Sequence, residues 1–150
     1  MGRRSRRASW RHGCGPGVTL VDTSAWVEYL RASTSPACDQ IRRLVENEGP
    51  LHTTDAVVME IMAGGRDDAH VAQLRRLLMR CQFVPTKGLQ DFEAAAMLYR
   101  QCRRRGETVR ALADCLIAAV AVRSGLPVLH ADKDFEVLAR HTALQLYSEG

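Results

Sequence analysis

The stretch Ala111-Leu112-Ala113-Asp114-Cys115-Leu116-Ile117-Ala118-Ala119-Val120-Ala121-Val122 holds one charged residue, Asp114. A helix that is apolar on nearly every side is a buried helix, so this segment predicts one. An ionised carboxylate that is buried without a positive partner costs several kcal/mol. Because the stretch contains no Lys or Arg, we expect Asp114 to open onto a cleft and to bind a cation there.

The size and composition of the chain limit what it can be. Its 150 residues suffice for one domain with a sizeable core. The longest apolar run, Cys115 to Val122, is far shorter than the roughly 20 residues that cross a bilayer, so we expect no transmembrane segment. The five cysteines are an odd number without close pairs, which argues against a disulfide framework or a cysteine zinc site. We therefore expect a protein of the reducing cytoplasm.

The positive charge of the chain comes from its first residues. Residues 1–17 contain five arginines and no acid, and without them the net charge of +4 becomes −1. Their Gly, Arg and Ser content is typical of disorder. They are either a nucleic-acid-binding arm or an extension of no consequence, and the abrupt start of strand-like sequence at Val18 favours the extension. We expect a basic, disordered extension over residues 1–17 and a single domain over residues 18–150.

Short apolar runs alternate with helical patterns along the rest of the chain. We expect strands near residues 18–21, 51–53, 81–84, 126–130 and 144–147, and helices near 25–31, 37–48, 56–63, 67–80, 90–105 and 111–124. In the helix at 90–105 the expected buried stripe is Phe92, Ala95, Ala96 and Tyr99. The alternation predicts an α/β fold with a central, mainly parallel sheet and helices on both faces.

Four acids lie in four separate segments, each against apolar sequence: Asp22, Glu60, Asp114 and Asp132. Taken singly, Asp22 and Asp132 could merely cap helices, and Glu60 could lie on a solvated edge. Sites in parallel sheets form beyond the carboxyl ends of the strands, where Asp22 and Asp132 are expected. Two carboxylates about 5 Å apart repel by about 3 kcal/mol at an effective dielectric constant of about 20. If all four converge, they cannot all stay ionised without a cation or a set of raised pKa values. Oxygen ligands of this kind select Mg²⁺ or Mn²⁺.

These residues also carry a family resemblance. The chain resembles the PIN-domain ribonucleases, and in particular the VapC toxins of type II toxin–antitoxin (VapBC) pairs. The matching stretches are Leu20-Val21-Asp22-Thr23-Ser24-Ala25-Trp26, Glu60 within residues 57–63, Asp114-Cys115-Leu116-Ile117-Ala118-Ala119, and Leu126-Pro127-Val128-Leu129-His130-Ala131-Asp132-Lys133-Asp134-Phe135. The resemblance spans residues 18–147 and implies a PIN-like three-layer α/β/α fold.

The resemblance implies a toxin that is a metal-dependent endoribonuclease. Asp22, Glu60, Asp114 and Asp132 would be the catalytic acids and the ligands of one or two Mg²⁺ or Mn²⁺ ions, and a metal-activated water would attack the RNA phosphodiester. Asp134 would either act through water in the second layer around the metal or cap the following helix. The implied partners are the RNA substrate, a VapB-type antitoxin that blocks the active site and forms a hetero-oligomer with the toxin, and a second toxin copy in a homodimer.

Three details depart from the family pattern or stay open. The family often has Ser or Thr shortly before the third acid, whereas Thr108 or Arg110 would have to supply that polar contact here. Thr23 and Ser24 could hydrogen-bond Asp22 or phosphate, or simply cap a helix. The arginines Arg100, Arg103, Arg104 and Arg105 either complement a helix dipole or grip RNA phosphates.

Other functions remain as alternatives. A haloacid-dehalogenase-like phosphatase needs a second Asp two residues after its nucleophile, where this chain has Ser24. A receiver domain needs a late lysine at a strand end, and the only lysines are Lys87 and Lys133. A catalytically inactive PIN-type RNA-binding or scaffold module is the remaining alternative, and the four intact acids count against it.

Overall fold

A single parallel sheet forms the centre of the protein. The computed structural model describes residues 18–149, so the extension expected over residues 1–17 lies outside the described part. Within that part the sheet has four strands in the order β3-β2-β1-β4, and each neighbouring pair is parallel. The strands are β1 (Thr19–Val21), β2 (Leu51–Thr53), β3 (Gln82–Phe83) and β4 (Val128–Leu129).

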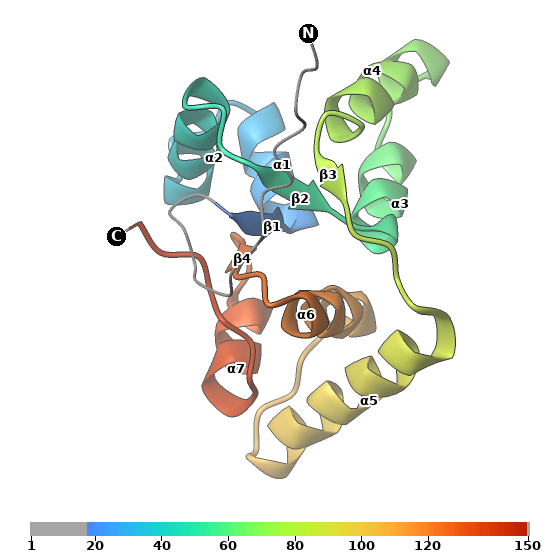
Figure 1. Ribbon diagram of the computed structural model, residues 1–150, viewed down its shortest axis with the longest axis vertical. Coiled ribbons are helices and arrows are strands. Elements are labelled where there is room, and N and C mark those ends of the chain that lie inside the picture. The colour runs from blue at the N-terminus through green and yellow to red at the C-terminus, as the bar shows by residue number, and fades with distance from the viewer. Residues whose placement is uncertain (1–17, 150) are drawn as a thin grey trace, which may run out of the picture.

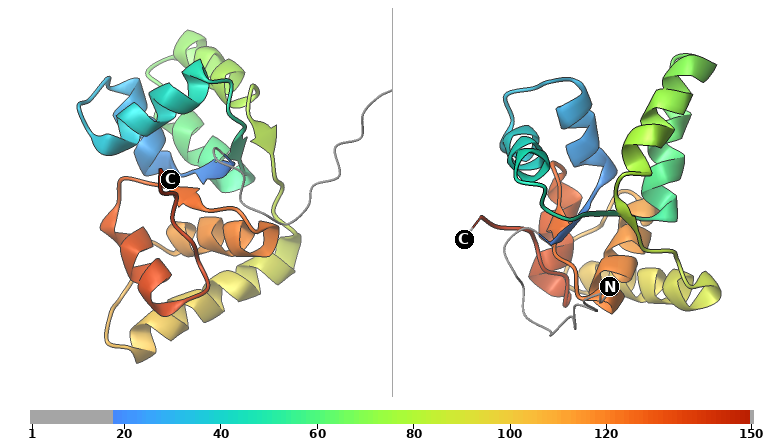
Figure 2. Two further views of the ribbon diagram at one scale, coloured as in Figure 1. Left: turned by 60° about the vertical axis from the view of Figure 1, so that its left-hand side comes forward. Right: turned by 45° about the horizontal axis from the view of Figure 1, so that its top comes forward.

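Helices cover the sheet on both sides. They are α1 (Thr23–Leu30), α2 (Pro36–Glu46), α3 (Asp55–Ala63), α4 (Asp68–Leu78), α5 (Gly88–Arg104), α6 (Leu112–Ser124) and α7 (Lys133–His141). Helices α1 and α2 lie on one side of the strands, and α5 and α6 on the other (Figures 1 and 2). This arrangement confirms the three-layer α/β/α fold. Within residues 18–149, none of these helices has the length and apolar character that a membrane span requires.

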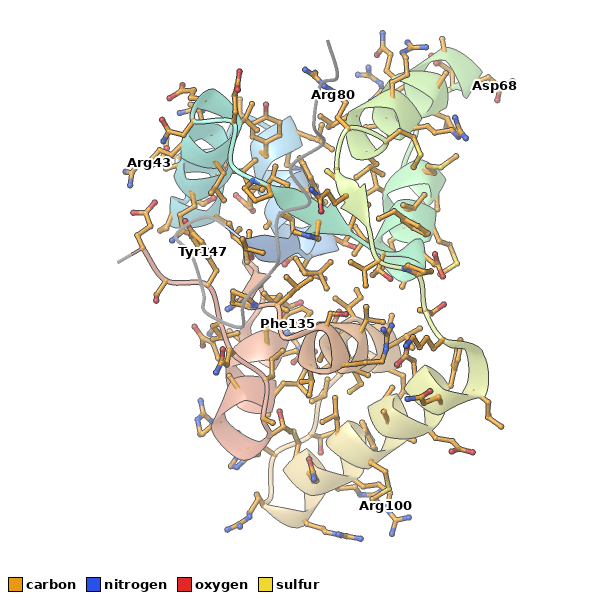
Figure 3. The ribbon with its side chains drawn as sticks, in the orientation of Figure 1. Arg43, Asp68, Arg80, Arg100, Phe135 and Tyr147 are labelled. Carbon is orange, nitrogen blue, oxygen red and sulfur yellow. The ribbon has the colours of Figure 1, made fainter. Side chains whose placement is uncertain are left out.

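Helix α6 is the buried helix that the sequence predicts. Its residues from Asp114 to Ala121 are buried with the exception of Leu116, which is half-buried. It packs against α5, α7 and α3, and α5 lies on its outer side, away from the sheet (Figure 1). Figure 3 shows Phe135 of α7 in the middle of the molecule, where its ring is fully buried in the core. Helix α6 is therefore enclosed, and its first turn carries Asp114 into the interior.

Several sequence-based expectations need correction at the ends of elements. Residues 144–147 do not form a strand, because only Leu146 makes a parallel bridge, with Val128. The strand expected at residues 81–84 is reduced to Gln82–Phe83, and both residues are exposed. An Asp next to the start of a helix is expected to cap it, but the N-cap of α3 is Thr54, and the carboxylate of Asp55 accepts a hydrogen bond from the Thr86 backbone N–H at 3.0 Å.

A buried ion pair joins α5 to α6. Asp91 accepts hydrogen bonds from Nε and Nη2 of Arg123, both at 2.9 Å, and from the Lys87 backbone N–H at 2.7 Å. Its side chain is 2% exposed and that of Arg123 is 21% exposed. The expected buried stripe of α5 is wrong at two positions, because Phe92 is 56% exposed and Ala96 is exposed as well. The register of α5 turns the paired Asp91 inward and Phe92 outward.

Replacing Arg123 by Ala should lower the free energy of unfolding by about 2 to 4 kcal/mol, because Asp91 would stay buried without its charged partner. Arg140→Ala is the matched control, since it breaks the exposed ion pair of Arg140 with Glu107. That change should cost less than about 1 kcal/mol. Urea unfolding followed by circular dichroism measures both, and equal losses would contradict the role given to the buried pair.

Candidate metal centre

The carboxylates that the sequence singles out lie where strands and helices meet. Asp22 follows β1 and is the N-cap of α1, and Asp132 follows β4 and is the N-cap of α7. Asp114 lies in the first turn of α6, and Glu60 lies within α3. Because β1 and β4 are neighbouring parallel strands, their carboxyl ends deliver Asp22 and Asp132 to the same edge of the sheet.

Asp22 is oriented by hydrogen bonds from one residue. Its Oδ2 accepts from the Ser24 backbone N–H at 2.9 Å and from the Ser24 hydroxyl at 2.6 Å. The same hydroxyl oxygen accepts from the Ala131 backbone N–H at 2.9 Å. Ser24 thus orients Asp22 and ties it to the loop that carries Asp132. Of the alternatives that the sequence allows for Ser24, the structure shows the hydrogen bond to Asp22, whereas the N-cap of α1 is Asp22 itself.

Glu60 is held toward the same site from α3. Its Oε1 accepts a hydrogen bond from the Thr23 hydroxyl at 3.0 Å. Thr23 is the first residue of α1 and directly follows Asp22. The adjacent hydroxyls of Thr23 and Ser24 therefore fix two different acids, which explains the Asp-Thr-Ser sequence in physical terms.

Three further carboxylates form a compact group. One oxygen each from Asp114, Asp132 and Asp134 lies within 4.8 Å of the others. Asp114 and Asp134 are buried, and Asp132 is half-buried. The helix-capping alternative for Asp134 is wrong, because the carboxylate of Asp132 caps α7 by accepting from the Asp134 backbone N–H at 3.0 Å. Asp134 belongs to the acidic group itself.

Arg110 contacts two members of this group. Its Nη2 donates to Asp132 Oδ1 at 3.2 Å and its Nε donates to Asp134 Oδ1 at 3.3 Å. The Arg110 backbone N–H donates to the other Asp134 oxygen at 3.0 Å. Of the two residues that the sequence offers for a polar contact before Asp114, the structure places Arg110 at the site. The pairing of Arg110 with Asp134 could not be predicted, since 24 positions separate them.

The pKa values of the innermost acids reflect their crowding. Burial raises the pKa of Asp114 to about 7, and the negative charges of Asp22, Asp132, Asp134 and Glu60 act in the same direction. Burial also raises the pKa of Asp22 to about 6, although its hydrogen bonds from Ser24 favour the ionised form. The other three predicted acids and Asp134 therefore all act electrostatically on Asp114.

The donor set fits a hard divalent cation. Every ligand that these acids offer is a carboxylate oxygen, the donor that Mg²⁺ and Mn²⁺ prefer. Asp22 Oδ1 is buried and has no hydrogen-bond partner within residues 18–149. A buried carboxylate oxygen without a donor is costly, and a cation at this position would remove that cost. Both oxygens of Asp134 accept hydrogen bonds from Arg110.

A cavity lies next to the acidic group. Its volume is about 380 Å³, and Asp132 forms part of its wall. The other walls come from Glu28 and the start of α2 on one side, and from His130 and the start of α7 on the other. Asp132 is thus the candidate acid that borders this hollow.

Comparison with known proteins places this architecture in a family. The sequence profile of the PIN domain matches residues 19–141. The chain belongs to the PIN domain family. The PIN match includes all four predicted acids together with Asp134 and Arg110.

Individual relatives support this assignment. The chain is similar to "Ribonuclease VapC11" of Mycobacterium tuberculosis, with 46% identity over 132 residues that cover 87% of this chain and 98% of the relative. It shares its fold with DNA-bound VapBC from Salmonella typhimurium, at a TM-score of 0.68 and 18% identity over 87% of this chain and 96% of that one. The chain also has the same fold as VapC20 of M. tuberculosis, a sarcin-ricin loop cleaving toxin. The TM-score is 0.57, and the identity is 19% over 79% of this chain and 92% of that one.

In buffer without divalent cations, the stability of this PIN domain should fall between about pH 4 and pH 7. Carboxyl groups titrate near pH 4 in an unfolded chain, whereas Asp22 and Asp114 have raised pKa values of about 6 and about 7 in the folded one. The folded state therefore binds more protons in this range, and stability is lost as the pH rises. Asp114→Asn should flatten the decline and raise the free energy of unfolding at pH 7.5 by roughly 1 to 3 kcal/mol. Urea unfolding across the pH range tests this, and a less stable Asp114→Asn protein would contradict it.

Replacing Ser24 by Ala should weaken Mn²⁺ binding about tenfold or more, because it removes the hydroxyl that orients Asp22 and joins it to Ala131. Calorimetric titration with MnCl₂ measures the affinity. Ser124→Ala, at the far end of α6 from Asp114, is the control and should bind Mn²⁺ like the unaltered protein. Equal affinities for all three proteins would show that Ser24 does not prepare the site.

Proposed function

We propose that this protein is the toxin of a type II toxin–antitoxin pair and acts as an Mg²⁺- or Mn²⁺-dependent endoribonuclease. The observation that carries the proposal is the compact carboxylate group around Asp114 and Asp132, on which the charges of Asp22 and Glu60 also act. The 46% identity to a ribonuclease over nearly the whole length of both chains supports the same activity. A catalytically inactive binding module is disfavoured, since it would have no use for four mutually repelling acids.

The four acids are the proposed catalytic residues and metal ligands, for one or two ions. When bound there, a divalent cation supplies positive charge toward the phosphodiester and lowers the pKa of the attacking water. Asp22 and Glu60 are held in place by Ser24 and Thr23, so their oxygens need little reorganisation when the cation enters. Asp114 must lose its proton for the site to bind a cation fully, because its pKa is about 7.

The proposed partners follow from the same relationships. The structural relative from S. typhimurium is a VapBC complex, and we propose a VapB-type antitoxin as the partner that blocks the acids of this chain. A cationic side chain placed among these carboxylates by the antitoxin would compete with the metal. The homodimer, the hetero-oligomer and the cytoplasmic location expected from the sequence also stay predictions.

Cleavage of total cellular RNA tests the activity. The purified protein, freed of any partner, should cut RNA into discrete fragments with Mg²⁺ or Mn²⁺ and leave it intact with EDTA. Asp114→Asn should lower the rate at least a hundredfold, because it removes a metal ligand at the centre of the cluster. Asp39→Asn, which alters an exposed acid of α2, is the matched control and should cleave normally.

Intact RNA under every metal, from a folded protein free of its partner, would contradict the proposal. Full activity of Asp114→Asn would contradict the ligand assignment alone. The two failures are thus separable.

A further inference from the structure

Arg110 is unusual among the arginines of the described chain because it contacts the metal centre while remaining open to solvent. Its side chain is 73% exposed, yet Nη2 and Nε reach Asp132 and Asp134. Within residues 18–149, the ion pairs of these two acids are made by Arg110 alone. Arg110 is therefore the cationic side chain that is ion-paired with this site among the described residues.

The two contacts of Arg110 differ in strength. The bond to Asp132 joins a largely exposed guanidinium to a carboxylate that is 34% exposed, and ion pairs of this kind contribute little, about 0 to 1 kcal/mol. The side chain of Asp134, in contrast, is 6% exposed, and it also accepts from the Arg110 backbone N–H at 3.0 Å. Asp134 thus anchors Arg110 at two points, whereas the contact with Asp132 is easily exchanged.

A cation bound by Asp132 would weaken that exchangeable contact, since it neutralises the carboxylate that attracts the guanidinium. Nε would stay on Asp134, and the terminal nitrogens would be free to donate elsewhere. A guanidinium offers five N–H donors in a planar fork that matches two oxygens of a phosphate. In a ribonuclease, the substrate group that must bind at this site is the RNA phosphate.

We propose that Arg110 binds an RNA phosphate at the metal centre, and that Asp134 is the positioning residue that aims it. This assignment rests on the proposed ribonuclease function and adds a substrate-contacting residue outside the four acids. The opposite role, a built-in cation that keeps metal out, is disfavoured because the exposed contact with Asp132 is too weak to compete with a divalent ion.

Binding of RNA without cleavage separates these roles. The probe is a fluorescein-labelled single-stranded RNA of mixed sequence, titrated by anisotropy in CaCl₂ under conditions in which a gel shows the RNA intact. A phosphate contact is independent of sequence, so the natural target is not needed. Arg110→Gln should bind about tenfold more weakly, and the slope of log affinity against log salt should fall by about 0.7, the value for one phosphate of a single strand. Arg110→Lys should keep most of the slope, since it keeps the charge and loses the fork.

Arg140→Gln is the matched control, because Arg140 is also an exposed arginine in an ion pair, with Glu107. It should leave both the affinity and the slope unchanged. Asp134→Asn should weaken RNA binding in the unaltered protein but not in the Arg110→Gln background, because a positioning residue acts only through Arg110. A merely structural role of Asp134 would weaken both equally.

Two results would overturn the proposal. One is an Arg110→Gln protein that binds RNA with unaltered affinity and slope. The other is an Arg110→Gln protein with tighter Mn²⁺ binding in calorimetry and faster RNA cleavage, which would identify Arg110 as an inhibitory cation. Failure of the ribonuclease function would appear separately, as absence of cleavage by the unaltered protein in Mg²⁺.

Discussion

Mutual repulsion of carboxylates is the constraint around which this protein is built. Burial and neighbouring charges raise the pKa of Asp114 to about 7 and that of Asp22 to about 6, so the fold holds these acids together at a cost near neutral pH. Core packing elsewhere must offset that cost. The enclosed helix α6, held between the sheet and α5, is the main element that places Asp114 where repulsion is greatest.

The supporting residues determine how the acids lie. Thr23 and Ser24 orient Glu60 and Asp22 from the first turn of α1, and Arg110 holds Asp134 at the opposite side. These contacts act before any cation arrives, which is what a prearranged site requires. These hydrogen bonds also distinguish Asp22 from Asp134. Among residues 18–149, one oxygen of Asp22 has no hydrogen-bond partner, whereas both oxygens of Asp134 accept hydrogen bonds from Arg110.

The sequence predicts the acidic centre better than it predicts its surroundings. Asp114 and Glu60 could be identified because each is the lone charge within an apolar run of its helix, and Asp22 because it ends an apolar strand. Asp91 is buried as well, but it lies between Gln90 and Phe92 with Glu93 close by, and its partner Arg123 lies 32 positions away. A pattern of local periodicity cannot show such a pairing.

Local periodicity is limited in the same way when it is used to predict the strands and helices. The order of strands and helices follows from periodicity, and the parallel sheet follows from their alternation. The end of the chain near Leu146 differs, because a strand exists only where a partner offers enough length for pairing, and β4 contributes two residues. Phe92 lies outside for a related reason, since the ion pair of Asp91 sets the rotation of α5.

Proton release on metal binding tests the central claim most directly. Calorimetric titration with MnCl₂ at pH 6.5, in buffers of different ionisation enthalpy, counts the protons that leave the protein. We predict release of about one proton at pH 6.5, given pKa values of about 6 for Asp22 and about 7 for Asp114, and nearly none at about pH 8.5. Binding without proton release at pH 6.5, or no Mn²⁺ binding at either pH, would contradict the account of a strained acidic centre that a divalent cation relieves.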